Sequence, residues 1–236
     1  MSDRKWKAII QIEYDALIKD NTWNLVPVCP SYKPMVCKWV FRTKYNTNGS
    51  VSKYKARLVA KGFYQTAGID YLETFSLVVK SSTMRVILSL AVMKGWKVRQ
   101  INVNNVFLNG DLSEDVYMTH PEGFVSKEGY ICKLNNALYG LKQVPRAWYD
   151  QLKSYLTTWQ FINSKADTSL FFKHDIRGMI IVLIYVDDIL LTDPDSALLK
   201  DFNTKLNKVF ALKNLGLLAY FLDVEVCYTT HGMHLL

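Results

Sequence analysis

Hydrophobic residues recur at three- and four-residue intervals in several stretches of the chain, and this spacing is typical of amphipathic helices. The first stretch begins at Trp6 and ends near Asp20, and a later one follows Pro145, a residue suited to the first turn of a helix. The sequence predicts helices over about residues 6–20, 81–95, 145–159 and 196–210.

Between Cys37 and Lys61 the helical spacing gives way to a pattern in which apolar and basic side chains alternate. A turn at Asn48-Gly49 separates the two alternating halves, which predicts a β-hairpin. One face of its second strand carries the cations Lys53, Lys55, Arg57 and Lys61. Crowded like charges suit a phosphate backbone or a triphosphate, although an ordinary solvated surface has the same pattern.

Shorter segments predict further strands, at about residues 97–103, 116–119, 131–134, 170–172 and 219–227. Strands in hairpins mixed with helices indicate an α+β fold. We expect a largely antiparallel sheet with the helices packed on one side of it.

The run from Met179 to Leu191 is apolar except for two adjacent carboxylates, Asp187 and Asp188. Because a carboxylate buried among such neighbours is costly, we predict two β-strands joined by a turn that exposes both acids. Two hard oxygen ligands on a rigid hairpin suit Mg²⁺, which usually binds through few carboxylates plus substrate phosphates. The run therefore predicts metal-dependent phosphoryl chemistry, with a plain hairpin and solvated acids as the alternative.

Composition narrows the class of partner. The 236 residues suffice for one large domain or two small ones, and the net charge of +8 favours a polyanion, either nucleic acid or an anionic membrane surface. The four cysteines lack Cys-x-x-Cys spacing, so neither a zinc site nor a disulfide framework is expected. Without a signal peptide or an apolar run long enough to span a bilayer, we expect a soluble intracellular protein.

Several ordered segments resemble the reverse transcriptases of copia-type retrotransposons. They are Cys37-Lys-Trp-Val-Phe, Tyr54-Lys-Ala-Arg-Leu-Val-Ala-Lys-Gly62, Gly68-Ile-Asp-Tyr, Val106-Phe-Leu-Asn-Gly-Asp-Leu112, Ala137-Leu-Tyr-Gly-Leu-Lys-Gln143, Pro145-Arg-Ala-Trp-Tyr149 and Tyr185-Val-Asp-Asp-Ile-Leu190. The resemblance implies a fingers-and-palm polymerase fold and RNA-directed DNA synthesis. It also implies an RNA or DNA template-primer, deoxynucleoside triphosphates and the rest of a Gag-Pol polyprotein as partners, and no membrane.

The resemblance divides the chain into three regions. Residues 1–95 are expected to form a fingers-like region with the basic hairpin, residues 96–212 a palm-like region with the Tyr-Val-Asp-Asp hairpin, and residues 213–236 a primer-grip-like segment. We expect a fragment of a polyprotein that stops before the thumb and ribonuclease H. Such a protein is expected in the cytoplasm, within virus-like particles, or in the nucleus, and not to be secreted.

The resemblance also implies roles for single residues. Asp187 and Asp188 match the catalytic carboxylates that bind Mg²⁺ or Mn²⁺. The matches to nucleotide-binding positions are Lys55, Arg57 and Lys61 beside the triphosphate, Gln143 beside the nucleotide and template, and Phe107, which excludes a ribose 2′-hydroxyl or is a core aromatic. The primer-grip matches are Tyr220, Phe221, Leu222 and Asp223, the last in place of the usual glycine.

One departure from the family concerns catalysis directly. Asn102 occupies the position of a third catalytic, metal-binding aspartate. A carboxylate can bridge two cations, whereas a carboxamide offers one neutral oxygen and an NH₂ group that a cation repels. We therefore expect a degenerate polymerase that is weakly active or inactive. The alternatives are a catalytically inactive remnant that binds nucleic acid and an unstable fragment without function.

Overall fold

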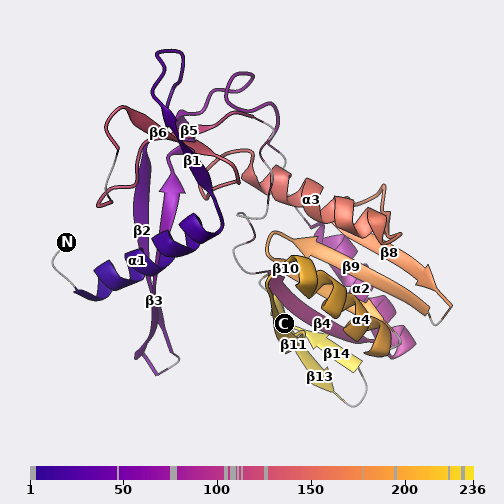
Figure 1. Cartoon of the computed structure of the whole chain (residues 1–236). Coiled ribbons are helices and arrows are strands. Elements are labelled where there is room, and N and C mark those ends of the chain that lie inside the picture. Colours follow the sequence, from indigo (N-terminus) through magenta and orange to yellow (C-terminus); the bar gives the residue numbers. More distant parts are fainter. Residues whose placement is uncertain are drawn as a thin grey trace. The chain divides into compact units, whose positions relative to one another are not determined.

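The computed structural model describes residues 4–46, 48–74, 79–103, 106, 110, 112, 114–124, 127–176, 178–193, 196–222, 224–229 and 232–236. Contacts divide the chain into two compact units, each built from two separated segments (Figure 1). Unit 1 comprises residues 1–75 and 107–148, and unit 2 comprises residues 76–106 and 149–236. The fingers-like, palm-like and primer-grip-like regions expected from the sequence stay a prediction, because those regions are defined by their role in polymerisation and these two units by internal contacts alone.

Unit 1 combines one long helix with two small antiparallel sheets. Its elements are α1 (Arg4–Lys19), β1 (Trp23–Pro27), β2 (Cys37–Tyr45), β3 (Val51–Ala60), the short 3₁₀ helix η1 (Gly62–Tyr64), β5 (Tyr117–Met118) and β6 (Tyr130–Leu134). The strands β2 and β3 form the hairpin predicted from the alternating pattern, and β1, β6 and β5 form a three-stranded sheet in that order. The helix α3 (Val144–Thr158) begins in unit 1, and its residues from 149 onward belong to unit 2.

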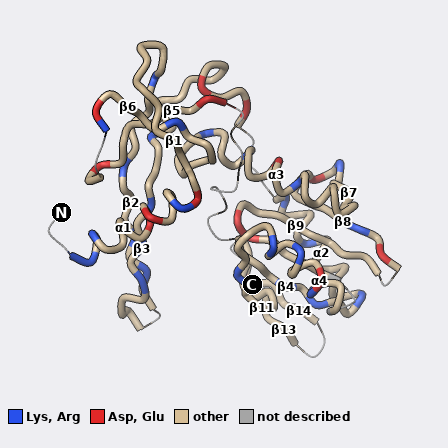
Figure 2. Tube along the Cα trace, in the orientation of Figure 1, with Lys and Arg blue, Asp and Glu red and all other residues tan. Residues whose placement is uncertain are grey.

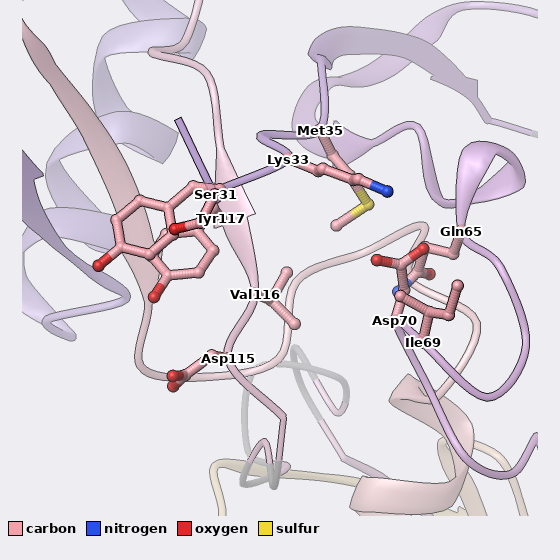
Figure 3. A pocket seen from close by; sticks show the side chains of 10 residues that line it. Ser31, Lys33, Met35, Gln65, Ile69, Asp70, Asp115, Val116 and Tyr117 are labelled. Atoms are coloured by element: carbon pink, nitrogen blue, oxygen red, sulfur yellow. The ribbon is translucent and has the colours of Figure 1, made fainter. Parts of the chain in front are cut away.

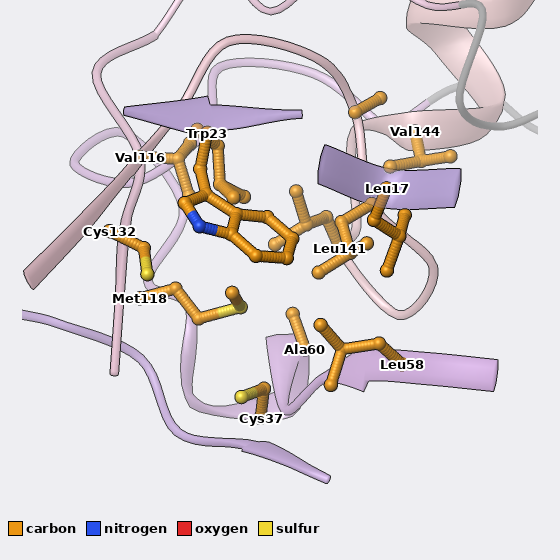
Figure 4. Close-up of a cluster of buried hydrophobic side chains, with 13 residues drawn as sticks. Leu17, Trp23, Cys37, Leu58, Ala60, Val116, Met118, Cys132, Leu141 and Val144 are labelled. Carbon is orange, nitrogen blue, oxygen red and sulfur yellow. The ribbon is translucent and has the colours of Figure 1, made fainter. Parts of the chain in front are cut away.

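The core of unit 1 joins residues that are far apart in the sequence (Figure 4). Leu17 of α1 and Leu58 of β3 are almost completely buried in this cluster, and Trp23, Met118 and Cys132 are among the residues that the three-stranded sheet contributes to it. Burial raises the pKa of the Cys132 thiol to about 12, with a smaller contribution from Cys37. Both cysteines therefore act as small core residues and not as reactive thiols.

Unit 2 is built on a six-stranded antiparallel sheet in the order β11-β4-β10-β9-β8-β7. These strands are β4 (Lys97–Val103), β7 (Ile162–Asn163), β8 (Leu170–Asp175), β9 (Gly178–Tyr185), β10 (Asp188–Asp193) and β11 (Leu212–Leu217). The helices are α2 (Ser81–Lys94), most of α3, and α4 (Ser196–Val209). The strands β12 (Tyr220–Phe221), β13 (Val224–Thr229) and β14 (Gly232–Leu235) form a separate small sheet.

The helices of unit 2 cover both faces of its large sheet, with α4 in front of the sheet and α2 behind it in Figure 1. Buried residues of α2 cluster with Leu183 and Leu190, which are register partners. On the opposite face, Phe171 of β8 contacts Tyr149 of α3. The predicted α+β fold with largely antiparallel sheets is confirmed, but the helices are not confined to one side. Helices lie on both sides because residues 180–184 of β9 are buried in succession, so both faces of this strand must be covered.

Among the described residues, the structure contains no helix whose length and apolar character would allow it to cross a membrane.

Candidate active site

The two adjacent acids lie at the tip of the β9–β10 hairpin, as predicted from the apolar run. Tyr185 pairs with Asp188, so Val186 and Asp187 form a two-residue turn. Val186 has a φ of 53°, a left-handed conformation that a β-branched residue rarely adopts and that costs about 1–3 kcal/mol. The turn holds both carboxylates at the end of a rigid hairpin.

Asn102 lies directly across from this hairpin on the neighbouring strand β4. Its Cα is the register partner of Asp188, so both side chains point to the same face of the sheet. The Asn102 Nδ2 donates hydrogen bonds to Asp187 Oδ2 at 3.0 Å and to Asp188 Oδ1 at 3.2 Å. The structure therefore brings together the three residues that the sequence nominated as catalytic.

Two further contacts fix the acids. The backbone N–H of Val103 donates to the Asp187 carbonyl at 2.8 Å, and Gln100 Nε2 donates to Asp188 Oδ1 at 3.2 Å. Gln100 was not predicted as a site residue, although the alternation of β4 places it on the same face as Asn102. In the part of the chain that the structure describes, neutral amides and not cations hold the two carboxylates.

The chemistry of this donor set decides which metal it fits. Asp187 and Asp188 can supply carboxylate oxygens to one divalent cation, together with substrate phosphate. Among the described residues, no group of three His, Cys, Asp or Glu side chains could hold a metal ion, so none of them adds a third carboxylate to this pair. The described donor set therefore fits one cation and lacks the third carboxylate that a second, shared cation would need.

The primer-grip candidates lie close to the same hairpin. Phe221 is buried, and its ring lies 6.1 Å from that of Tyr185 in an edge-on arrangement. Tyr220 is exposed, and Leu222 has a φ of 49° in the turn between β12 and β13. Asp223 lies outside the described residues. Unit 2 thus places Phe221 beside the hairpin that carries the acids, with Tyr220 and Leu222 on either side of it in the sequence.

The basic hairpin of unit 1 carries more cations on one face than its second strand alone suggested. Register pairs Arg42 with Lys55 and Lys44 with Lys53, while Lys38 and Arg57 lie on the same face by alternation. Figure 2 shows that Lys and Arg positions recur along both β2 and β3. Directly opposed like charges destabilise a hairpin unless an anion offsets them. The cations of β2 were visible in the alternating pattern, but only their pairing with those of β3 shows how dense the charge is.

Three of the predicted cations, Lys61, Lys55 and Arg57, differ in their surroundings. Lys61 follows directly after β3, which ends at Ala60, and its N–H donates to the Val36 carbonyl at 2.8 Å, which continues the register of the hairpin by one residue pair. Partial burial, followed by the neighbouring Arg57 charge, lowers the pKa of Lys55, and Glu13 opposes this shift. The Arg57 guanidinium lies 4.3 Å from the centre of the Tyr139 ring.

Gln143 is buried, with only 4% of its surface exposed. Its Oε1 accepts a hydrogen bond from Gln65 Nε2 at 3.0 Å, and its Nε2 donates to the Asp70 carbonyl at 3.4 Å. Gln65 carried no sequence signal and was missed. Lys55, Arg57, Lys61 and Gln143 belong to unit 1 and the two acids to unit 2. Phe107 lies outside the described residues.

A pocket of about 190 Å³ lies in unit 1 beside Gln65 (Figure 3). The rings of Tyr32 and Tyr117 stack at 4.0 Å on one side of it, and Asp70 lies on the other. The Asp70 carboxylate accepts a hydrogen bond from the Thr66 N–H at 2.7 Å. No sequence pattern predicted this pocket, because its walls come from three segments that are separate in the sequence.

The chain is similar to known proteins of one family. Residues 20–236 match the family model described as reverse transcriptase (RNA-dependent DNA polymerase). The chain is 48% identical over its full length to a retrovirus-related Pol polyprotein from transposon RE1 of Arabidopsis thaliana. It is 41% identical over 92% of its length to that of transposon TNT 1-94 of Nicotiana tabacum. The expected similarity to copia-type polymerases is confirmed.

The chain spans only 16% and 17% of the lengths of these two polyproteins. Among solved structures, the foamy viral protease-reverse transcriptase in complex with double-stranded DNA matches with a TM-score of 0.50. That match covers 99% of this chain and 36% of the viral chain at 16% identity, so it concerns the fold alone.

Proposed function

Because the chain belongs to the reverse transcriptase (RNA-dependent DNA polymerase) family, we propose that it is the template- and primer-binding polymerase domain of a transposon Pol polyprotein, with an attenuated catalytic centre. Its substrates would be a template-primer of RNA or DNA and deoxynucleoside triphosphates. Primer extension would join the primer 3′-hydroxyl oxygen to the α-phosphorus and release pyrophosphate.

The observation that carries this proposal is the contact of Asn102 with both acids. Asp187 Oδ2 and Asp188 Oδ1 lie within 3.2 Å of one carboxamide nitrogen, so the acids converge on the point where a third carboxylate would belong. Such convergence on one face of a sheet is what a phosphoryl-transfer site requires.

Within this site, Asp187 and Asp188 would hold one Mg²⁺ or Mn²⁺ ion. When bound, a divalent cation supplies charge that acidifies the attacking hydroxyl and stabilises negative charge on the phosphate. Asn102 works against that loading, because its NH₂ group already occupies the inward oxygens of both carboxylates. The catalytic rate would be low because of this competition and because Asn102 supplies no third carboxylate to the cation.

The basic face of the β2–β3 hairpin would bind the phosphates of nucleic acid or of the nucleotide. Its opposed pairs, Arg42 with Lys55 and Lys44 with Lys53, are relieved when a polyanion lies over them. Arg57 and Gln143 are proposed to lie near the nucleotide, as the family resemblance implies. This binding depends on salt and not on a metal ion.

Primer extension on an RNA template tests the proposal. We expect slow extension by the parent chain in Mg²⁺ or Mn²⁺, none by Asp188→Asn, and a rate about 10² higher or more for Asn102→Asp. The refutation would be Asn102→Asp extending no faster than the parent while Asp188→Asn leaves the rate unchanged. Matching circular dichroism spectra for the three proteins would control for misfolding.

A second candidate function is nucleic-acid binding without catalysis. It is favoured by the same Asn102 contacts, because they give both carboxylates a hydrogen-bond partner without any cation. In that case affinity for an RNA–DNA hybrid would fall steeply with salt and survive EDTA, and Asn102→Asp would not restore extension. An affinity that is lost in EDTA would count against this alternative.

A further inference from the structure

The turn that follows the basic hairpin presents two adjacent aromatic rings to solvent. Phe63 is 65% exposed and Tyr64 is 67% exposed, and their ring centroids lie 4.3 Å apart at an angle of 42°. Large aromatic side chains usually bury their faces, so a contiguous exposed pair indicates a binding surface. Neither residue belongs to the site proposed for catalysis.

The backbone under these rings is fixed on both sides. A Cβ at Gly62 would lie 2.1 Å from the Gly140 carbonyl oxygen, so this glycine is in direct contact with a distant segment. On the other side, the buried Gln65 side chain accepts from the Lys142 N–H at 2.8 Å and donates to Gln143 at 3.0 Å. The two rings therefore project from a rigid turn, which limits the entropy lost when a ligand binds.

The charge around the turn favours an anionic ligand. Lys142 Nζ donates to the Gln65 carbonyl at 3.0 Å, which holds an ammonium at the residue directly after Tyr64. The nearby acids are engaged within the fold: Asp70 accepts from the Thr66 N–H, and Glu73 pairs with Arg146 at 2.7 Å. The Lys142 ammonium has three donors and uses one for the Gln65 carbonyl, so it can still donate to a phosphate at this turn, while the neighbouring carboxylates are held by the Thr66 N–H and by Arg146.

We propose that Phe63 and Tyr64 form a stacking platform for unpaired nucleobases, with Lys142 taking an adjacent phosphate. Bases stack on aromatic rings regardless of sequence, and a flanking cation tracks the backbone. An apolar protein partner would use the rings equally well but would gain nothing from the ammonium, so the observations favour single-stranded nucleic acid. This inference rests on the proposed function, since it names a second contact for the same polymer.

The test compares two RNA–DNA duplexes that differ only in an unpaired extension of several nucleotides, using fluorescence anisotropy at fixed salt. We expect the parent to bind the extended duplex about tenfold more tightly than the blunt one. The double variant Phe63→Leu/Tyr64→Leu keeps apolar bulk but removes both rings, so it should lose this difference while its affinity for the blunt duplex stays unchanged. Phe63→Trp should retain the difference.

Leu72→Ala is the matched control, because Leu72 is 76% exposed in the following loop and has no ring. It should preserve the tenfold difference. The inference is overturned if the double variant still distinguishes the two duplexes, if it weakens both equally, or if Leu72→Ala abolishes the difference as well. A parent that binds neither duplex would instead overturn the proposed function, so the two failures are distinguishable.

Discussion

The Asn102 carboxamide donates through one nitrogen to Asp187 and to Asp188, at 3.0 and 3.2 Å. These hydrogen bonds stabilise the acid pair when no cation is present. In the proposed cation site the same carboxamide would oppose cation binding, because its NH₂ group is repelled by a cation.

The thermal stability of Asn102→Asp should therefore depend on metal. In EDTA this variant loses two hydrogen bonds and brings three carboxylates together, so we expect it to be less stable than the parent by about 1–3 kcal/mol. Saturating Mg²⁺ or Mn²⁺ should raise its melting temperature much more than that of the parent. Asn102→Ala, which adds no charge, should also be less stable than the parent in EDTA, but the metal ion should not raise its melting temperature as it does that of Asn102→Asp. Equal metal-induced shifts for parent and Asn102→Asp would contradict this account.

Gly140→Ala should unfold or strongly destabilise unit 1. A Cβ there would lie 2.1 Å from the Ala60 carbonyl oxygen, and the glycine has a φ of +94°, so we expect a loss of about 3 kcal/mol or more in urea denaturation. Gly123→Ala is the control, with a φ of +88° but nothing within 4 Å of the new Cβ. It should cost about 1 kcal/mol, from backbone strain alone. Similar losses in both variants would show that the close approach of Gly140 to β3 is not tight.

Asp167 should make unit 2 sensitive to acid. Its carboxylate, 5% exposed, accepts from Thr83 Oγ1 at 2.6 Å and from the Lys80 N–H at 3.2 Å, which ties the start of α2 to the loop before β8. Burial alone would raise the pKa of Asp167, but hydrogen bonds from Ser169 and Thr83 outweigh it and lower the pKa below that of an ordinary aspartate. A lowered folded-state pKa gives stability that is complete above the unfolded value and is lost as the pH falls through the folded value.

We accordingly expect Asp167→Asn to destabilise the chain by about 1–3 kcal/mol at neutral pH, with the difference from the parent shrinking below about pH 4. Urea midpoints measured across that range would check it. The exposed Asp201, which pairs with Lys205 of the same helix at 3.1 Å, provides the control, and Asp201→Asn should change stability by less than about 0.5 kcal/mol. A pH-independent difference for Asp167→Asn would exclude the linkage.

Lys53→Glu should shift stability and binding in opposite directions. Lys53 faces Lys44 across the hairpin, so the substitution turns a repulsive pair into an attractive one worth about 0.2–1 kcal/mol. The same change removes a cation from the basic face, so affinity for nucleic acid should fall and its dependence on salt should become shallower. Lys53→Gln should give an intermediate result in both measurements. Unchanged affinity and salt dependence would show that this face does not bind phosphate.

The sequence alone determined the local features of this protein. Alternation identified the β2–β3 hairpin and its basic face, and the cost of burying Asp187 and Asp188 within an apolar run identified the acidic turn. The helices were predicted within a few residues, and Gly95 ends α2 in the left-handed conformation expected of a terminal glycine. These features depend on neighbours along the chain, which periodicity reports directly.

Only the tertiary structure decided which distant segments meet. Asn102 and the acids are 85 and 86 residues apart in sequence, and their hydrogen bonds depend on the register between β4 and β10. Three further features have no periodic pattern in the sequence. They are the buried pair Gln65 and Gln143, the fixed turn that carries Phe63 and Tyr64, and the helices on both faces of the large sheet. Register and close packing arise from long-range contacts, so a pattern of polar and apolar positions can nominate residues for a site but cannot bring them together.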